Sequence, residues 1–144
     1  MSLKNLMMLV LSVSLVIGVA LMGGCAPSEV ETPTQIIENI TPQEASTLIQ
    51  NNQNNPDFVI IDVRTSEELA DGHIENAINI DYYSETFRDE LNNLDKSKTY
   101  LIYCRSGNRS AKALNRMAEL NFREVYNILE GIVRWKAEGL PTTK

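Results

Sequence analysis

The sequence contains few of the residues that build metal centres and disulfide frameworks. Only two of its 144 residues are cysteine, Cys25 and Cys104, and His73 is its one histidine. A single histidine has no second histidine with which to form a metal site, and Gly72-His73-Ile74 is typical of a turn rather than of a catalytic triad. Two cysteines allow one disulfide bond on count alone. We therefore expect no metal site and no cofactor.

Positive charge is also scarce. The formal net charge is −6, with 13 lysine and arginine residues against 19 aspartate and glutamate residues. Nucleic-acid binding needs a basic surface, so this balance argues against a nucleic-acid partner. The chain has no internal repeat and no long run of charge, and aromatic residues make up 6% of it. Its length and its 43% of hydrophobic residues suit one domain with an aliphatic core.

The first 24 residues differ in composition from the rest of the chain. Lys4 is followed by the apolar run Leu6–Met22, then by two glycines and Cys25. This order resembles a secretory signal peptide that ends in a bacterial-type lipobox, although Met22 stands where leucine is usual. It predicts residues 1–24 as the signal peptide, with Cys25 lipidated as the new N-terminus. The alternative is an uncleaved transmembrane anchor, because the run is near the lower length limit for a span.

Both alternatives predict an extracytoplasmic domain that is anchored to a membrane of the cell envelope. If Cys25 is lipidated, Cys104 has no partner in its own chain for a disulfide bond. Residues 25–35 are polar and contain proline and threonine, so we expect a short linker there. The folded domain is then predicted to span residues 36–144.

Apolar runs alternate with segments of helical period over residues 36–144. Thr41-Pro42 followed by Glu44 predicts a capping box at the start of a helix. Strands that alternate with helices predict an α/β fold, with a mainly parallel central sheet of about five strands and helices on both faces. The expected strands are Ile36–Ile40, Phe58–Val63, Ala77–Ile80, Tyr100–Tyr103 and Val125–Ile128, and the expected helices start at Pro42, cover Ser66–Asp71 and Ser84–Leu94, start again at Arg109, and cover Ile132–Glu138.

The stretch Thr99–Ser110 (TYLIYCRSGNRS) carries the strongest functional signal. An apolar and aromatic run ends at Cys104, Ser106 and Gly107 break the pattern, and a helical period begins at Arg109. A strand, a tight loop and a helix in this order direct successive backbone N–H groups into one concavity. Such a loop stabilises the thiolate of a cysteine at its mouth. Ligands of parallel sheets bind at the carboxyl ends of the strands, where Cys104 is expected to lie.

Three segments resemble those of a single-domain rhodanese, a member of the sulfurtransferase family. Ile61–Ile80 (IDVRTSEELADGHIENAINI) is similar to the family's DVR segment, Cys104–Ser110 (CRSGNRS) to its active-site loop, and Leu129–Pro141 (LEGIVRWKAEGLP) to its C-terminal segment. The resemblance covers nearly all of the predicted domain and implies a rhodanese-like fold. The sequence departs from the family pattern at four positions away from the loop, Ser66, Asn76, Asp81 and Glu130.

The resemblance implies that Cys104 is the catalytic nucleophile of a sulfurtransferase. It would take sulfane sulfur from a small anionic donor such as thiosulfate, hold it as a persulfide, and pass it to a thiol or cyanide-like acceptor or to an envelope protein. Arg105 is expected to face the donor. Arg109 has two predicted roles, contact with the anion or pairing with a carboxylate of the Ile61–Ile80 segment. The implied substrate-binding residues, whose backbone N–H groups form a cradle for the anion, are Arg105, Ser106, Gly107, Asn108 and Arg109.

Two other functions stay open. A module without turnover would carry persulfide, bind a partner or sense redox state through the same cysteine. A phosphatase or arsenate reductase would use a related cysteine loop. Phosphatase loops have the form C-x5-R, however, and Cys104 to Arg109 is C-x4-R. The loop also lacks a histidine or aspartate that could protonate a departing alkoxide, so its sequence favours sulfur transfer.

Other charged and aromatic residues are predicted to be structural. Asp62 and Arg64 are expected to form ion pairs at a strand end, and Trp135 is expected to pack in the core. Arg109, Lys112 and Arg116 share one helix face, which indicates either a basic docking strip or a solvated face, and the helical pattern favours the solvated face for Lys112 and Arg116. The opposite, buried face of that helix is predicted to carry Ala111, Leu114, Met117 and Ala118.

Overall fold

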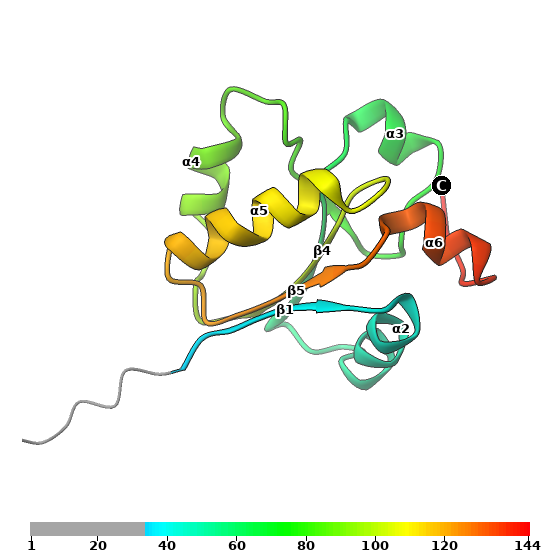
Figure 1. Cartoon of the computed structure of the whole chain (residues 1–144), viewed down its shortest axis with the longest axis horizontal. Coiled ribbons are helices and arrows are strands. Elements are labelled where there is room, and N and C mark those ends of the chain that lie inside the picture. The colour runs from blue at the N-terminus through cyan, green and yellow to red at the C-terminus, as the bar shows by residue number, and fades with distance from the viewer. Residues whose placement is uncertain (1–33) are drawn as a thin grey trace, which may run out of the picture. The chain divides into compact units, whose positions relative to one another are not determined.

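The computed structural model describes residues 34–144 (Figure 1). The predicted signal peptide, Cys25 and residues 26–33 of the predicted linker lie outside the described residues, so the predictions made for them stay predictions. Within residues 34–144, no helix is long enough and apolar enough to cross a membrane.

Five parallel strands form one sheet in the order β1-β5-β4-β2-β3. The central strand β4 pairs with β2 on one side and with β5 on the other. The strands are β1 (Ile36–Ile40), β2 (Phe58–Asp62), β3 (Ile78–Asn79), β4 (Thr99–Tyr103) and β5 (Glu124–Ile128). The helices are α2 (Pro42–Asn51), α3 (Ser66–Ala70), α4 (Phe87–Asn92), α5 (Asn108–Glu119) and α6 (Gly131–Ala137).

Helices cover both faces of this sheet, as Figure 1 shows. Successive side chains of β4 point to opposite faces, because a strand has a side-chain period of two. Tyr100 and Ile102 pack with α4 and α5, whereas Leu101 and Tyr103 pack with α2 and α6. The sheet therefore lies between two apolar clusters, and the predicted α/β fold class is confirmed.

Local sequence signals account for several helix starts. Thr41 and Glu44 form the predicted capping box of α2. A second capping box, between Thr65 and Glu68, begins α3 and was not predicted. The predicted role of Trp135 is confirmed, since its ring is buried and its Nε1 donates a hydrogen bond to the carbonyl of Pro141 at 2.9 Å.

Two predicted elements are shorter than expected. The strand predicted over Ala77–Ile80 covers only Ile78–Asn79, and the helix predicted over Ser84–Leu94 begins at Phe87. The hydroxyl of Ser84 accepts a hydrogen bond from the amide of Thr86 at 3.2 Å. Side-chain hydrogen bonds of this kind offer the backbone an alternative to the helix, which explains the later start.

The buried face of α5 also differs from the prediction. Leu114 and Met117 are buried as expected, but Ala111 and Ala118 are only half buried. The remaining buried positions are Ser110 and Ala113, so the buried residues follow the spacing i, i+3, i+4 and i+7. This rotation brings the hydroxyl of Ser110 to the inner side of the helix, and it leaves Lys112 and Arg116 exposed as predicted.

Candidate active site

Cys104 lies at the carboxyl end of the central strand, directly after β4 and four residues before α5. Its side chain belongs to the cluster beneath α5, and the residue is 1% exposed. Gly107 caps α5 with a φ of +91°, a left-handed conformation that costs glycine little. The chain therefore turns tightly between the strand and the helix, around the cysteine sulfur.

Two donors contact the sulfur directly. The backbone N–H of Gly107 lies 3.1 Å from Cys104 Sγ, and the hydroxyl of Ser110 donates to Sγ at 3.4 Å. The Ser110 hydroxyl also lies 3.2 Å from the carbonyl oxygen of Gly107, so it is held within the first turn of α5. Both donors stabilise negative charge on the sulfur.

The balance of these influences lowers the pKa of the Cys104 thiol. Burial raises it, because the thiolate loses its water. Hydrogen bonds from the hydroxyl and the backbone of Ser110 act in the opposite direction, as do the backbone amides of Ser106 and Gly107. The pKa ends below its ordinary value, so the site favours the nucleophilic thiolate.

The start of α6 holds the outside of this loop. The N–H of Ile132 donates to the carbonyl of Cys104 at 2.9 Å, and the N–H of Val133 donates to the carbonyl of Arg105 at 3.1 Å. Gly131 sits so close that a Cβ atom there would collide with the carbonyl oxygen of Cys104. The close approach requires glycine, and it fixes two loop carbonyls on the α6 side while the Gly107 N–H faces the sulfur.

Arg109 forms a bidentate ion pair with Glu68 of α3. Its Nη1 and Nη2 atoms donate to the two carboxylate oxygens at 2.7 and 2.8 Å. The guanidinium also lies over the ring of Tyr83, 5.3 Å from its centroid. Hydrogen bonding to Glu68 raises the pKa of Arg109. Of the two predicted roles of Arg109, the structure shows the pairing with a carboxylate of the Ile61–Ile80 segment.

The other predicted site residues line the loop on its solvent side. Arg105, Ser106 and Asn108 are exposed, and Gly107 is half buried. A dissolved anion can reach the guanidinium of Arg105 from solvent, which suits the role predicted for it. Cys104 is the one free cysteine among residues 34–144.

The predicted structural ion pair at the end of β2 is confirmed. Arg64 donates to both carboxylate oxygens of Asp62 at 2.6–3.0 Å, and its Nη2 donates to the carbonyl of Gly72 at 2.9 Å. Both side chains are buried, and Asn79 donates to the backbone carbonyls of both residues. His73 lies in the turn after α3, where its backbone pairs with Thr143. These contacts fix the chain between β2 and β3.

Sequence reasoning missed three residues of this site, Ser110, Gly131 and Tyr83. Ser110 follows Gly107 by three residues, and this helical spacing was available as a signal for a buried hydroxyl beneath the loop. Gly131 has no signal of its own within the Leu129–Pro141 segment. Tyr83 carried no signal, because it meets Arg109 through tertiary packing alone.

Comparisons with known proteins agree with this fold. The profile of the rhodanese-like domain family matches residues 41–138. The chain belongs to the rhodanese-like family. The predicted family and the five-stranded fold are therefore confirmed for a single rhodanese-like domain.

Named relatives of this rhodanese-like domain include enzymes of two kinds. It is 31% identical to a sulfurtransferase of Allochromatium vinosum, over 68% of this chain and 90% of that protein. It is 36% identical to a tRNA uridine(34) hydroxylase of Yersinia pestis, over 60% of this chain but only 26% of that protein. The rhodanese-like domain thus spans nearly all of the first relative and about a quarter of the second.

Solved structures show the same fold. A rhodanese-related protein from Thermoplasma volcanium superposes with a TM-score of 0.62 at 29% identity, over 74% of this chain and 97% of that chain. A rhodanese-like domain protein from Staphylococcus aureus superposes with a TM-score of 0.58 at 34% identity, over 74% of this chain and 99% of that chain.

Proposed function

We propose that this protein is a sulfurtransferase that takes sulfane sulfur from thiosulfate and carries it as a persulfide on Cys104. The observation that carries the proposal is the surroundings of Cys104 Sγ. The Gly107 amide and the Ser110 hydroxyl donate to this sulfur, and the thiol pKa is lowered. The sulfurtransferase relative, which this chain covers almost completely, supports the same chemistry.

The first step is an attack of the Cys104 thiolate on the outer sulfur of thiosulfate. A bond forms between Sγ and that sulfur, the S–S bond of thiosulfate breaks, and sulfite leaves with the electron pair. Sulfite is a good leaving group, so the step needs little help from a general acid. The product is a persulfide, whose anion the loop amides stabilise as they stabilise the thiolate. Arg105, which follows Cys104 in the chain and is exposed, attracts the dianionic donor.

The second step regenerates the Cys104 thiolate. A thiolate or cyanide acceptor attacks the outer sulfur of the persulfide, a bond to that sulfur forms, and the bond to Sγ breaks. The electron pair stays on Sγ, which the same donors stabilise. The cycle needs no external oxidant or reductant, because one sulfur atom is transferred as a unit.

The position of Arg109 supports sulfur chemistry over phosphate chemistry. In cysteine phosphatases the loop arginine helps to enclose the phosphoryl oxygens. Here both terminal nitrogens of Arg109 donate to Glu68, and the loop is one residue shorter than C-x5-R. One residue spans up to about 3.3–3.6 Å of chain, comparable to the difference between enclosing one sulfur atom and enclosing a phosphate.

Intact-mass measurement of the purified domain after incubation with thiosulfate tests the proposal. We expect the added mass of one sulfur atom in the native protein, none in Cys104→Ser, and loss of the adduct with formation of thiocyanate when cyanide is added. Aryl-phosphate hydrolysis without any sulfur adduct would overturn the proposal. An adduct that forms but is never released to cyanide or thiols would instead assign the protein as a persulfide carrier without turnover.

We also propose that the domain is held at a membrane of the cell envelope through lipidated Cys25. The proposal rests on the order of Lys4, the apolar run Leu6–Met22 and the glycines before Cys25. Metabolic labelling with a fatty acid should mark the native protein and not Cys25→Ser. Label and processing that survive in Cys25→Ser would contradict it.

A further inference from the structure

Residues of α4, of α5 and of the segment before α4 line a basic depression, which begins about one helical turn after the start of α5. It has a volume of about 460 Å³, and its lining includes the half-buried Tyr82 and the buried Phe87. Arg88 comes from α4, whereas Lys112 and Arg116 come from α5. All three cations are exposed. The only carboxylate that lines the depression in the described part of the chain is that of Glu85.

The depression is positively charged although the chain as a whole is negatively charged. The whole chain has a net charge of −6, yet three cations face one carboxylate here. Arg116 also pairs with Glu119 at 2.8 Å, but both side chains are exposed, and such surface pairs exchange partners at little cost. A larger depression of about 670 Å³ beside α2 and Trp135 offers no comparable charge, because Glu75 is the one charged residue that lines it.

The depression is also continuous with the site. Lys112 follows Arg109 by three residues and so lies on the same side of α5. Tyr83, over whose ring Arg109 lies, is 68% exposed. Its ring packs edge-on against that of Tyr82 in the depression, with the two ring centroids 5.6 Å apart. An exposed tyrosine beside arginine side chains is typical of the centre of a protein–protein interface. Tyr83 therefore contacts both Arg109 of the site and Tyr82 of the depression.

We propose that the α4–α5 depression docks an acidic segment of a protein that accepts sulfur from Cys104. The inference rests on the proposed function and names the partner class of that same site. Lys112 and Arg116 are four residues apart, a rise of about 6 Å along the helix. In an extended segment, side chains two residues apart on one face are separated by about 6.6–6.8 Å. Acidic residues at alternate positions therefore match the two cations, with Arg88 on the opposite wall.

Three synthetic peptides of equal length test the docking. Each carries one cysteine, followed by alternating serine with glutamate, with glutamine or with lysine. The protein is first loaded with sulfur from thiosulfate, and the transfer of that sulfur to each peptide is timed. We expect the glutamate peptide to react about tenfold faster than the glutamine peptide at low ionic strength, and the lysine peptide to be slowest. The difference should collapse at high salt.

Two double variants locate the effect. R88E/K112E should abolish the advantage of the glutamate peptide, whereas R123E/K136E, the same charge change at two exposed positions outside the depression, should retain most of it. Both variants should still load sulfur on Cys104 and pass it to cyanide. Equal rates for the three peptides, or equal losses in the two variants, would overturn the docking inference. A failure to load sulfur at all would instead overturn the proposed function.

A single-stranded RNA oligonucleotide serves as a competitor, since RNA is also a polyanion. We expect it to slow transfer to the glutamate peptide only through general screening, to the same extent in the native protein and in R123E/K136E at matched salt. Tight RNA binding that disappears in R88E/K112E would assign the depression to RNA and overturn the inference.

Discussion

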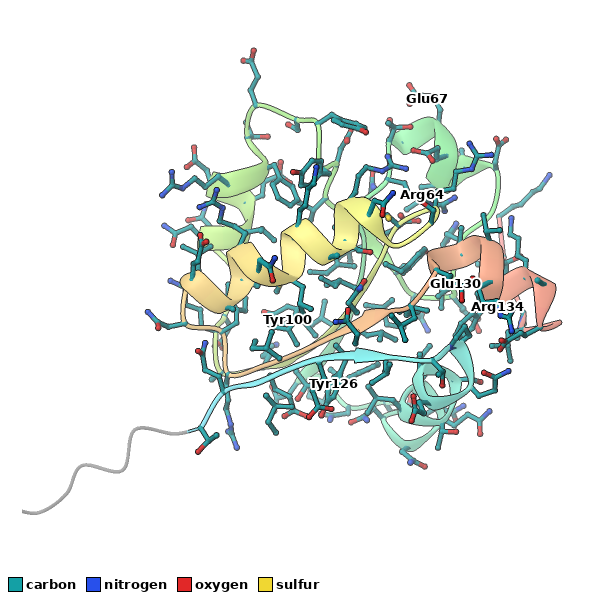
Figure 2. The ribbon with its side chains drawn as sticks, viewed as in Figure 1. Arg64, Glu67, Tyr100, Tyr126, Glu130 and Arg134 are labelled. Carbon is teal, nitrogen blue, oxygen red and sulfur yellow. The ribbon has the colours of Figure 1, made fainter. Side chains whose placement is uncertain are left out.

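Two arginine–carboxylate ion pairs involve residues of the Ile61–Ile80 segment, and they differ in how far they are buried. Arg64 and Asp62 have side chains that are 5% and 0% exposed, whereas Arg109 and Glu68 are 15% and 29% exposed. The first pair closes the chain between β2 and β3, and the second ties the start of α5 to α3. Figure 2 shows Arg64 near the carboxyl end of the sheet. The same chemical pair thus supports the fold in one place and the site in the other.

Burial explains the difference. A fully buried ion pair contributes little beyond an apolar pair of similar size, but the removal of one partner leaves a charge without water or counter-charge. A pair that is partly open to solvent loses less, because water replaces the missing partner. Breaking the buried Arg64–Asp62 pair should therefore lower mainly the stability, whereas breaking the Arg109–Glu68 pair should lower mainly the activity.

The largest effect is expected for Arg64→Ala. The substitution leaves the buried carboxylate of Asp62 uncompensated and removes the donor to Gly72, so the free energy of unfolding should fall by about 3–5 kcal/mol. Urea unfolding followed by circular dichroism measures it. The double variant Asp62→Leu with Arg64→Met should be less destabilised than Arg64→Ala. A loss below about 1 kcal/mol for Arg64→Ala would remove the distinction between the two pairs.

Glu68→Gln should lower the free energy of unfolding by only about 1 kcal/mol while it impairs sulfur loading, because it releases Arg109. Arg109, followed by smaller influences, lowers the pKa of Glu68 from 4.5. The stabilising contribution is thus complete above about pH 4.5 and lost as pH falls through the folded pKa. Unfolding curves at several pH values should show this loss in the native protein and not in Glu68→Gln. A larger loss of stability than in Arg64→Ala would contradict the comparison.

Ser110→Ala should change the reactivity of Cys104 while it leaves the stability of the loop nearly unchanged. It removes a hydrogen bond that lowers the pKa of Cys104, so the thiol pKa should rise and the pH profile of sulfur loading should move to higher pH. Stability should change by about 1 kcal/mol or less. Alkylation rates measured against pH report the thiol pKa directly. Ser110→Thr keeps a hydroxyl and should keep most of the native profile; a profile unchanged in Ser110→Ala would exclude this role.

The smallest effect is expected for Glu130→Gly, a change beside the loop that touches neither arginine pair. Glu130 has a φ of +58°, which strains a residue with a side chain. Glycine removes the strain but gains freedom in the unfolded chain, so the net stabilisation should be about 0.5 kcal/mol. Thermal unfolding should show a slight rise in the melting temperature, with sulfur loading unchanged. A drop in stability would indicate that the Glu130 side chain makes a favourable contact.

Much of the fold and the centre of the site could be predicted because the signals are local. Buried parallel strands appear as continuous apolar runs, and the capping box of α2 is complete within Thr41–Glu44. Cys104 could be found because the strand, the turn at Gly107 and the helix that follow one another in the chain also form the site. The start of α4 could not be predicted, since the hydrogen bond from the Thr86 amide to the Ser84 hydroxyl competes with the helical pattern there.

The sequence by itself determined the position of Cys104 after a buried strand, the tight loop around it and the parallel sheet, because each depends on residues within a few positions of one another. Only the tertiary structure decided between the two roles of Arg109, since its partner Glu68 lies 41 residues earlier in the chain. It likewise decided that Gly131 supports the loop and that Ser110 rather than Ala111 turns inward. Such contacts depend on how the helices rotate and pack on the sheet, and packing is a property of the whole core rather than of any short segment.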